Sequence, residues 1–351
     1  MSGKIRVGVI GAGIGYVHAK AYKGVPDAEL VAIADLDKPR AEKLAKDFCV
    51  PNVYTDYKKM MKEEKLDAVS VGLPNFLHKT VTIDAFKAGC HVICEKPMAM
   101  NAEEAEQMIE AGQKAKKILM IGFCHRHRAD SKLLKKIITE GQLGDIYHSQ
   151  IFALRRRGIP GWGGWFTTKA KSGGGGLIDI GVHIVDLTMW EMGFPKPVAV
   201  SGAEYMKFGH KKDYTYVSMW GARQEGGTYD VDDLASAFIR FDNDATMSLE
   251  VSWAANIKSG GFYSIILGDK GGAKLDADAP LEIYSEQYGK LVDIQPQYAK
   301  EDNWVNQLSH FVDCIKNGKK PMSPGEHGLQ VQKILDAIYL SSKIKKEVII
   351  K

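Results

Sequence analysis

Three polar residues in the stretch 177–192 have the types and the spacing to move a proton. The stretch has the apolar periodicity of a helix, and Asp179, His183 and Asp186 follow one another at intervals of four and three residues, so they share one helix face. Histidine can accept the proton that an alcohol loses on oxidation, because its ordinary pKa lies near neutral pH. Asp179 can orient the imidazole or bind a neighbouring hydroxyl. Asp186 can contact another hydroxyl or can be a carboxylate on the helix surface.

A second group suited to alcohol chemistry is Lys96. It follows an apolar, strand-like run at 91–94 and stands between Glu95 and Pro97. Ligands of an open parallel sheet bind beyond the carboxyl ends of its strands, so a cofactor and a substrate could both reach Lys96. A fixed ammonium group there would stabilise negative charge on the reacting oxygen. Taken alone, the tripeptide also fits an exposed Glu–Lys pair after a strand.

The start of the chain has the pattern of a dinucleotide-binding turn. A β-branched run at 4–10 leads into Gly11, Gly13, Ile14 and Gly15, and a helical pattern follows. Such a turn lets the backbone approach a pyrophosphate, to which the helix N-terminus offers N–H donors. The third glycine comes one residue earlier than in the usual G-x-G-x-x-G pattern, so the packing of the helix on the strand must adjust.

Asp35 predicts which dinucleotide is bound. It ends the second predicted strand, 22 residues after Gly13, which suits a carboxylate that accepts hydrogen bonds from the adenosine ribose. A carboxylate here accepts from a free 2′-hydroxyl and repels a 2′-phosphate, so we expect NAD rather than NADP. Lys38 and Arg40 lie close by and keep NADP as the less favoured alternative.

The elements that must position these groups fall into two domains. Up to residue 122, strands and helices alternate with short connections, which predicts a doubly wound parallel sheet of the Rossmann type. After residue 144, hairpin-like strands predict a large, mostly antiparallel sheet. We therefore expect an α/β protein with a dinucleotide-binding domain over 1–122 and a substrate-binding and oligomerisation domain over 123–351. The strands expected in the second domain are 145–154, 197–207, 234–241, 246–253, 262–268 and 281–285, and the helices are about 130–139, 177–192, 303–317 and 326–344.

One long segment between these elements is rich in arginine, glycine and tryptophan. Residues 155–165 include three consecutive arginines and two tryptophans, and a run of four glycines follows at 173–176. Loops of this length in a compact domain are usually functional. Arg156 and Trp162 are therefore candidate substrate contacts, although the arginines fit a solvated basic surface equally well.

Composition narrows the class of protein. The 351 residues are 45% hydrophobic and 26% charged with a net charge of +4, which is typical of a globular protein and indicates neither a nucleic-acid nor a membrane partner. The five cysteines are scattered without a metal-ligand spacing, so we expect free thiols, no metal ion and a reducing, cytoplasmic location. No segment has the pattern of a signal peptide or approaches the ~18 apolar residues of a membrane span.

Several motifs combine into a recognisable set. They are the glycine turn 11–15 with His18, Pro74-Asn75 with His78, Glu95-Lys96-Pro97, the stretch 122–126, and the stretch 174–183 with its Asp-x-x-x-His spacing. With these motifs the chain resembles the Gfo/Idh/MocA oxidoreductases (glucose–fructose oxidoreductase, inositol dehydrogenase and their relatives) along essentially its whole length. The resemblance implies a nicotinamide cofactor, a sugar, polyol or related carbohydrate as substrate, and a homodimer or homotetramer formed through the open sheet.

The resemblance also implies roles for individual residues. Lys96 would act near the nicotinamide and the reacting hydroxyl, with His183 as the acid/base and Asp179 beside them. His125 departs from the Asn or Tyr of many members, and His18 and His78 are expected to be structural or on the cofactor side. The expected cofactor contacts are Gly11, Gly13, Ile14, Gly15, Asp35, Pro74, Asn75, His78, Glu95 and Lys96. The expected substrate contacts are Lys96, His125, Arg126, Arg156, Trp162, Asp179, His183 and Asp186.

Three classes of function remain open at this point. The first is a dehydrogenase that transfers a hydride between a secondary alcohol and freely exchanging NAD. The second is an enzyme that retains its NAD and uses transient oxidation for glycoside cleavage, elimination or epimerisation. The third is a non-catalytic sugar or dinucleotide sensor, against which the intact Lys96, Asp179 and His183 argue.

Overall fold

The structure, a computed structural model, describes residues 3–211, 213–215, 221 and 223–350. The chain forms two compact units: unit 1 is Met1–Arg128 with Glu301–Leu329, and unit 2 is Ala129–Lys300 with Gln330–Lys351. Unit 1 contains β1 (Ile5–Ile10), α1 (Gly15–Tyr22), β2 (Ala28–Ala34), α2 (Lys38–Phe48), β3 (Asn52–Tyr54), α3 (Tyr57–Glu63), β4 (Ala68–Val71), η1 (Asn75–Leu77), α4 (His78–Lys87), β5 (His91–Cys94), α5 (Ala102–Ala115), β6 (Leu119–Ile121), η2 (Cys124–His127) and α9 (Asn303–Asn317).

Unit 2 contains α6 (Ala129–Thr139), β7 (Ile146–Leu154), η3 (Trp165–Thr167), α7 (Lys169–Ser172), η4 (Leu177–Gly181), α8 (Val182–Glu191), β8 (Pro197–Tyr205), β9 (Leu234–Phe241), β10 (Thr246–Ser252), β11 (Gly261–Gly268), β12 (Gly272–Asp276), β13 (Glu282–Gln287), β14 (Lys290–Ile294) and β15 (Val348–Ile349). Helix α10 (Gly325–Ile344) begins in the residues of unit 1 and ends in those of unit 2. None of the helices in the described part of the chain is long and apolar enough to cross a membrane.

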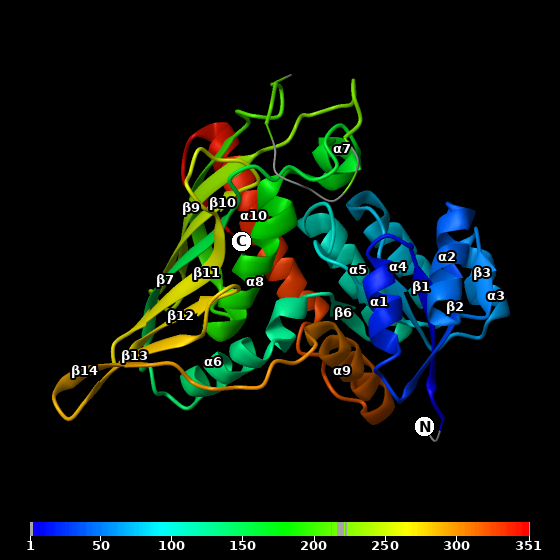
Figure 1. Ribbon diagram of the computed structural model, residues 1–351, viewed down its shortest axis with the longest axis horizontal. Helices are drawn as coiled ribbons and strands as arrows, with labels where there is room; N and C mark the ends of the chain where they lie inside the picture. Colours follow the sequence, from blue (N-terminus) through cyan, green and yellow to red (C-terminus); the bar gives the residue numbers. More distant parts are fainter. Residues whose placement is uncertain (1–2, 212, 216–220, 222, 351) are drawn as a thin grey trace. The chain divides into compact units, whose positions relative to one another are not determined.

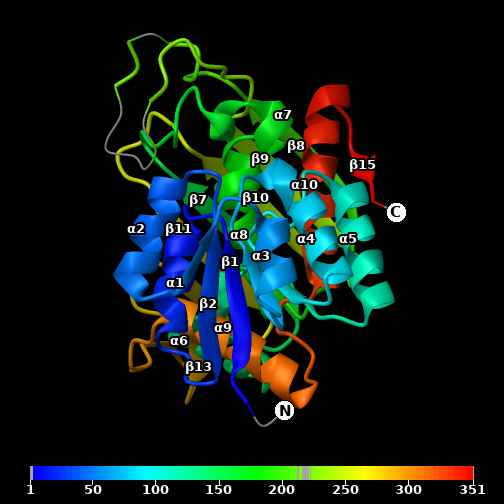
Figure 2. The same ribbon diagram turned by 90° about the vertical axis from the view of Figure 1, so that its right-hand side faces the viewer.

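The sheet of unit 1 is parallel throughout, in the order β3-β2-β1-β4-β5-β6. Helices α1 and α2 cover one face and α3, α4 and α5 cover the other (Figures 1 and 2). Because every strand enters its sheet in the same direction, the turns after β1, β2, β4 and β5 all lie at one edge. This is the doubly wound arrangement that the sequence predicts, and its carboxyl edge is where such folds bind dinucleotides.

Helix α9 packs in unit 1, although the division at residue 122 assigns it to the second domain. Its buried side chains Leu308, Phe311 and Val312 join the same core as Ala19 and Tyr22 of α1. The amphipathic pattern of 303–317 correctly predicts a helix, but a pattern of apolar residues does not say which core the helix will cover. The chain therefore returns to the first unit near its end.

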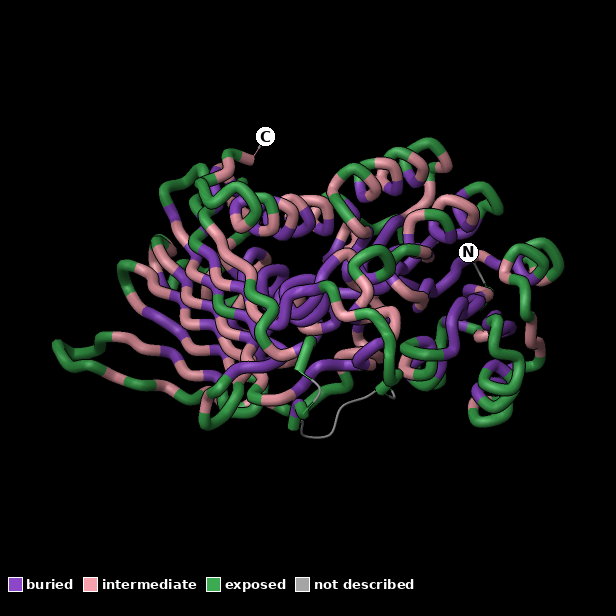
Figure 3. Tube along the Cα trace, turned by 90° about the horizontal axis from the view of Figure 1, so that it is seen from above, coloured by how far each residue is buried: buried purple, intermediate pink, exposed green. Residues whose placement is uncertain are grey.

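Unit 2 is built on a nine-stranded sheet in the order β14-β13-β12-β11-β7-β10-β9-β8-β15. All neighbours are antiparallel except β7 and β10, which run parallel. Burial alternates along β7, β9 and β10, as Figure 3 shows, because one face lies under helices such as α8 and α6 and the other does not. The large, mostly antiparallel sheet is as predicted; β12, β14 and β15 are additional strands, and β13 extends the strand expected at 281–285.

Candidate active site

The turn between β1 and α1 depends on Gly11. Its φ is +96°, and a Cβ there would lie 2.2 Å from the carbonyl oxygen of Gly72, so only glycine lets this turn lie against the turn after β4. Ile14, at the N-cap of α1, makes no side-chain capping bond, and the first N–H groups of an α-helix have no intrahelical partners. These groups are suited to a pyrophosphate despite the shortened glycine pattern.

Asp35 follows β2 and is fixed by the backbone around it. Its carboxylate accepts hydrogen bonds from the N–H groups of Ala12, at 2.6 Å, and Asp37, at 2.8 Å. The guanidinium of Arg40 donates to both oxygens, at 2.9 and 3.1 Å. Burial would raise the pKa of Asp35, but these hydrogen bonds and the nearby positive charge outweigh it and lower that pKa, so the group is a carboxylate at neutral pH.

Apolar side chains are exposed at the same edge of unit 1. Ile14 in the glycine turn is 38% exposed, Leu36 directly after Asp35 is 90% exposed, and Phe76 after β4 is 41% exposed. Solvent-exposed apolar groups beside a buried carboxylate are suited to the flat faces of an adenine. The glycine turn, the carboxylate and these side chains therefore fit an adenine dinucleotide.

Lys96 follows β5 and is half-buried, while the neighbouring Glu95 is buried. Glu95 Oε1 lies 2.9 Å from Nε2 of the buried His18, and Glu95 Oε2 accepts the N–H of Lys96 at 3.3 Å. A Cβ on Gly122 would lie 2.5 Å from the same carboxylate, so the glycine after β6 leaves room for Glu95. Glu95 and His18 thus hold the backbone from which the Lys96 side chain extends.

His78 ties the turn after β4 to the turn after β5. Its Nδ1 lies 2.8 Å from the carbonyl oxygen of Pro97, and its Nε2 lies 2.8 Å from that of Leu73. Burial lowers the pKa of His78, and the two carbonyl groups oppose this effect because only the imidazolium form, which carries two N–H groups, can donate to both. Asn75, in η1, is also buried. His78 therefore acts on the position of Lys96-Pro97, in keeping with its predicted structural or cofactor-side role.

In unit 2, Asp179 is buried and held from a distant strand. The indole N–H of Trp253, just after β10, donates to Asp179 Oδ2 at 2.9 Å. The helix expected over 177–192 begins with the π-turn η4, which contains Asp179, and continues as α8, which carries His183. Such wide turns within helices are frequent at functional sites. The half-buried His183 and the buried Asp179 remain about one turn apart on one helix face.

Asp186 is buried, at 1% exposure, so the interpretation of this residue as a surface carboxylate is wrong. It lies on α8 with His183, three residues further along. An aspartate in such a buried position needs polar partners, because removing a charge from water costs several kcal/mol or more otherwise. Its proposed contact with a substrate hydroxyl stays a prediction.

The sequence analysis missed Asp232, which organises the glycine run before this helix. Its carboxylate accepts the N–H groups of Gly175, at 2.7 Å, and Leu177, at 2.9 Å, and the hydroxyl of Tyr339, at 2.8 Å. A Cβ on Gly175 would lie 1.8 Å from the Asp232 carbonyl oxygen, and one on Gly174 would lie 2.1 Å from the Tyr339 hydroxyl. The glycines are therefore required for close packing against Asp232 and Tyr339. Two consecutive acids before the apolar strand at 234–241 were the available signal.

Side chains of the loop at 155–165 pack against Phe208, Tyr214 and Tyr229. Trp162 is 9% exposed and packs edge-on against Tyr214 and Tyr229, with ring centroids 4.7 and 5.8 Å away. The guanidinium of Arg157 donates to the Ala255 carbonyl oxygen, whereas Arg156 is exposed. Trp162 is thus part of a small aromatic core, which gives no support to its predicted contact with substrate.

Arg126 and His125, the two remaining predicted substrate contacts, lie in η2. Arg126 is fully buried; it donates to the Met322 carbonyl oxygen at 2.5 Å and approaches His327 Nδ1 at 3.0 Å. These bonds join η2 to the segment before α10 and to the first turn of α10, so they support a structural role. His125 is half-buried.

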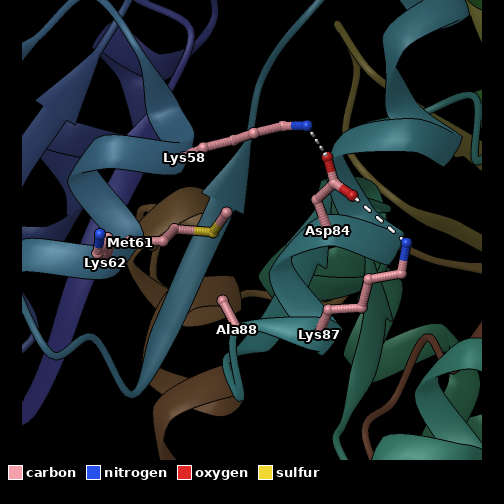
Figure 4. Close-up of a pocket in the computed structure, with 6 residues that line it drawn as sticks. All are labelled: Lys58, Met61, Lys62, Asp84, Lys87 and Ala88. Carbon is pink, nitrogen blue, oxygen red and sulfur yellow. Dashed lines mark ion pairs between the residues drawn. The ribbon is translucent and has the colours of Figure 1, made fainter.

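A surface hollow of unit 1 lies between α3 and α4 and is lined by Lys58, Met61, Lys62, Asp84, Lys87 and Ala88. Asp84 pairs with Lys58 Nζ at 3.1 Å and with Lys87 Nζ at 3.7 Å, as Figure 4 shows. Lys87 and Ala88 end α4 just before β5 begins, so this end of the hollow lies at the edge of the sheet opposite Lys96. The hollow contains none of the residues predicted for the reaction.

The fold and these residues define a nicotinamide-dependent oxidoreductase of two α/β domains. A family model described as "Oxidoreductase family, NAD-binding Rossmann fold" matches residues 5–123, and one described as "Oxidoreductase family, C-terminal alpha/beta domain" matches residues 135–350. The chain belongs to the Gfo/Idh/MocA family. The predicted family, the fold class, the NAD cofactor and the assignment as an enzyme are thereby confirmed.

Similar proteins include several characterised dehydrogenases. The chain is 36% identical to D-glucoside 3-dehydrogenase of Escherichia coli, over 97% of this chain and 96% of that protein. It is 26% identical to myo-inositol 2-dehydrogenase of Thermotoga maritima, over 92% of each. Among solved structures, an oxidoreductase domain protein from Kribbella flavida is 26% identical with a TM-score of 0.89, covering 99% of this chain and 100% of that one. Levoglucosan dehydrogenase in complex with NADH and L-sorbose is 25% identical with a TM-score of 0.85, covering 99% of each chain.

Proposed function

We propose that this enzyme oxidises a secondary alcohol of a sugar, polyol or sugar derivative and transfers the hydride to NAD. The observation that carries the proposal is the combination, in one chain, of a dinucleotide turn completed by Asp35 with a helix that presents Asp179 and His183 on one face. The names of D-glucoside 3-dehydrogenase and myo-inositol 2-dehydrogenase both describe oxidation of a ring alcohol, which supports a carbohydrate substrate.

The roles of the side chains follow from the charge that the reaction creates. A bound nicotinamide dinucleotide supplies the hydride acceptor. His183 takes the hydroxyl proton and later releases it to water, so that a CH–OH group becomes a C=O group with loss of one hydride and one proton. Lys96 stabilises the negative charge on the reacting oxygen. Asp179, held by Trp253, keeps the imidazole oriented or binds an adjacent hydroxyl of the substrate.

The cofactor contacts divide into direct and indirect ones. We propose that Gly11, Gly13, Ile14 and Gly15 receive the pyrophosphate and that Asp35 receives the ribose. Pro74 and Asn75, at the turn after β4, would border the nicotinamide half. His78 and Glu95 act through the backbone they hold rather than by touching the cofactor, because their polar atoms bond to protein groups.

A dehydrogenase screen tests the proposed activity. Purified protein with NAD is offered inositols, hexoses, glucosides, sugar acids and sugar phosphates, and reduced nicotinamide is followed by absorbance. We expect turnover with at least one ring alcohol, and none on the same panel with His183→Ala, which controls for contaminating enzymes. If the protein binds NADH but oxidises no alcohol, the proposal is wrong. Nicotinamide absorbance in protein purified without added cofactor would indicate retained NAD, the alternative mechanism.

We further propose that the chain forms a homodimer or homotetramer through the face of the large sheet opposite α8. Phe152 of β7 and Tyr263 of β11 stack there with ring centroids 4.8 Å apart, and Phe238 of β9 is exposed on the same face. Apolar surfaces of this kind commonly mark interfaces. The predicted cytoplasmic location remains a prediction.

Sedimentation at micromolar concentration is expected to give the mass of a dimer or tetramer. Phe152→Asp puts a charge on the proposed interface and should shift the protein to lighter species. Tyr147→Asp, at an exposed residue near the start of the same strand, should leave the mass unchanged. A monomeric wild-type protein would contradict the proposal.

A further inference from the structure

The carboxylate of Asp35 has no acceptor position left for a ribose hydroxyl. A carboxylate offers roughly four lone-pair sites. Oδ2 accepts from Ala12 N–H and from the Arg40 guanidinium, and Oδ1 accepts from Asp37 N–H and from the same guanidinium. Two of the four bonds come from backbone groups that shape the turns. The other two come from one nitrogen of Arg40, which is the one partner that can leave without unfolding a turn.

Arg40 is free to leave Asp35 at small cost. Its side chain is 52% exposed, so the guanidinium returns to water when it leaves, and the buried Asp35 carboxylate keeps its two backbone N–H donors. A single terminal nitrogen contacts both oxygens, so the pair lacks the two parallel bonds of the strongest arginine–carboxylate geometry. Arg40 lies in the first turn of α2, and its Nε is 3.9 Å from Oδ2 of Asp37. The guanidinium can therefore pair with the Asp37 carboxylate after it leaves Asp35.

We propose that Arg40 sets the choice between NAD and NADP by competing for Asp35. The 2′- and 3′-hydroxyls of NAD bind Asp35 only after Arg40 has moved away, which weakens NAD binding. A 2′-phosphate pairs with Arg40 instead, which also offsets its repulsion by Asp35. The enzyme then prefers NAD but accepts NADP more readily than Asp35 alone would allow. This inference rests on the proposed dinucleotide-dependent function and assigns its cofactor preference to one exposed residue.

Binding of reduced cofactors to the purified protein, measured by fluorescence titration without substrate, tests the inference. In Arg40→Ala we expect the affinity for NADPH to fall on the order of tenfold, the loss of one charge-assisted contact. The affinity for NADH should stay the same or rise a few-fold, because Asp35 is no longer occupied. Kinetic preference between NAD and NADP should change in the same direction.

Lys38→Ala is the matched control. Lys38 lies two residues away, carries the same charge and pairs with Glu42 at 3.6 Å rather than with Asp35. Lys38→Ala should change the ratio of NADPH to NADH affinity by less than about threefold, because solvent and salt screen the effect of an exposed charge that makes no direct contact. Arg40→Lys should retain part of the NADPH affinity.

Two results would overturn the inference. If Arg40→Ala leaves the affinities for NADPH and NADH both unchanged, Arg40 does not discriminate, and if both affinities fall by the same factor, it only supports the turn. In both cases the wild-type protein still binds NADH, so the proposed function stands. Failure of the wild-type protein to bind either dinucleotide would contradict the proposed function and this inference together.

Discussion

Lys96→Ala is expected to lower kcat by about 10²–10³ while leaving NADH binding nearly intact. The ammonium group is proposed to act on the reacting oxygen, and removing one electrostatic stabiliser of a transition state typically costs a factor of this size. Because the charge develops only during the reaction, kcat should fall more than KM rises. Steady-state kinetics on the substrate found in the screen, with a fluorescence titration of NADH, measures both quantities.

The structure explains why the fold should survive this substitution. Glu95, His18 and His78 hold the backbone around residue 96 through their own hydrogen bonds, and none of these uses the Lys96 ammonium. Lys87→Ala is a matched control, since it removes a lysine at the far end of α4 that pairs only weakly with Asp84, at 3.7 Å. Near-normal kcat in Lys96→Ala would remove this lysine from the proposed mechanism.

The second large effect is expected at His183. If its neutral imidazole accepts the hydroxyl proton, kcat for alcohol oxidation rises with pH through a single ionisation. His183→Ala should abolish this rising limb of the pH profile of kcat, together with most of the activity. A pH profile of kcat for wild type and variant is the measurement. If the variant keeps the same limb, another group is the base, and His125 or Lys96 would be the next candidate.

Substitutions around Asp179 should shift that limb in opposite directions. A nearby carboxylate favours the imidazolium form and raises the pKa of the histidine, so Asp179→Asn should move the limb to lower pH. Trp253→Phe removes the N–H that partly neutralises Asp179, so the carboxylate should act more strongly and the limb should move to higher pH. A merely structural role for Trp253 would lower stability without moving the limb. If the limb moves in the same direction in both variants, the proposed arrangement is contradicted.

Local patterns in the sequence predicted most of the chemistry. The Gly11 turn, the carboxylate after β2 and the lysine after β5 could be placed because each follows a strand, and parallel strands end at one edge of a sheet. The shared face of Asp179 and His183 followed from helical periodicity alone. The π-turn at η4 was not predicted, yet residues about one turn apart stay on one face of it. These features depend on neighbours within a few residues, which the sequence shows directly.

The environment of these groups depended on residues far along the chain. Trp253 lies 74 residues from Asp179, and Tyr339 lies 107 residues from Asp232, which it binds beside the glycine run. No local period encodes such contacts, because each requires two distant segments to pack before their polar groups meet. For this reason Asp232 was missed and Asp186 could not be placed as buried.

Packing also decided which polar residues are exposed and which core each helix joins. Arg126 was a predicted substrate contact from the family resemblance, and Trp162 was one from its place in the long loop at 155–165. In the structure Arg126 donates to the Met322 carbonyl oxygen and Trp162 packs against Tyr214. Helix α9 was recognisable from its apolar face, but only the tertiary structure showed that this face covers α1 in unit 1. The sequence by itself determined the fold class and the family motifs and indicated the proposed reactive groups, since these follow from short-range pattern. Tertiary structure alone decided how those groups are held, because burial and long-range hydrogen bonds depend on the packing of the whole chain.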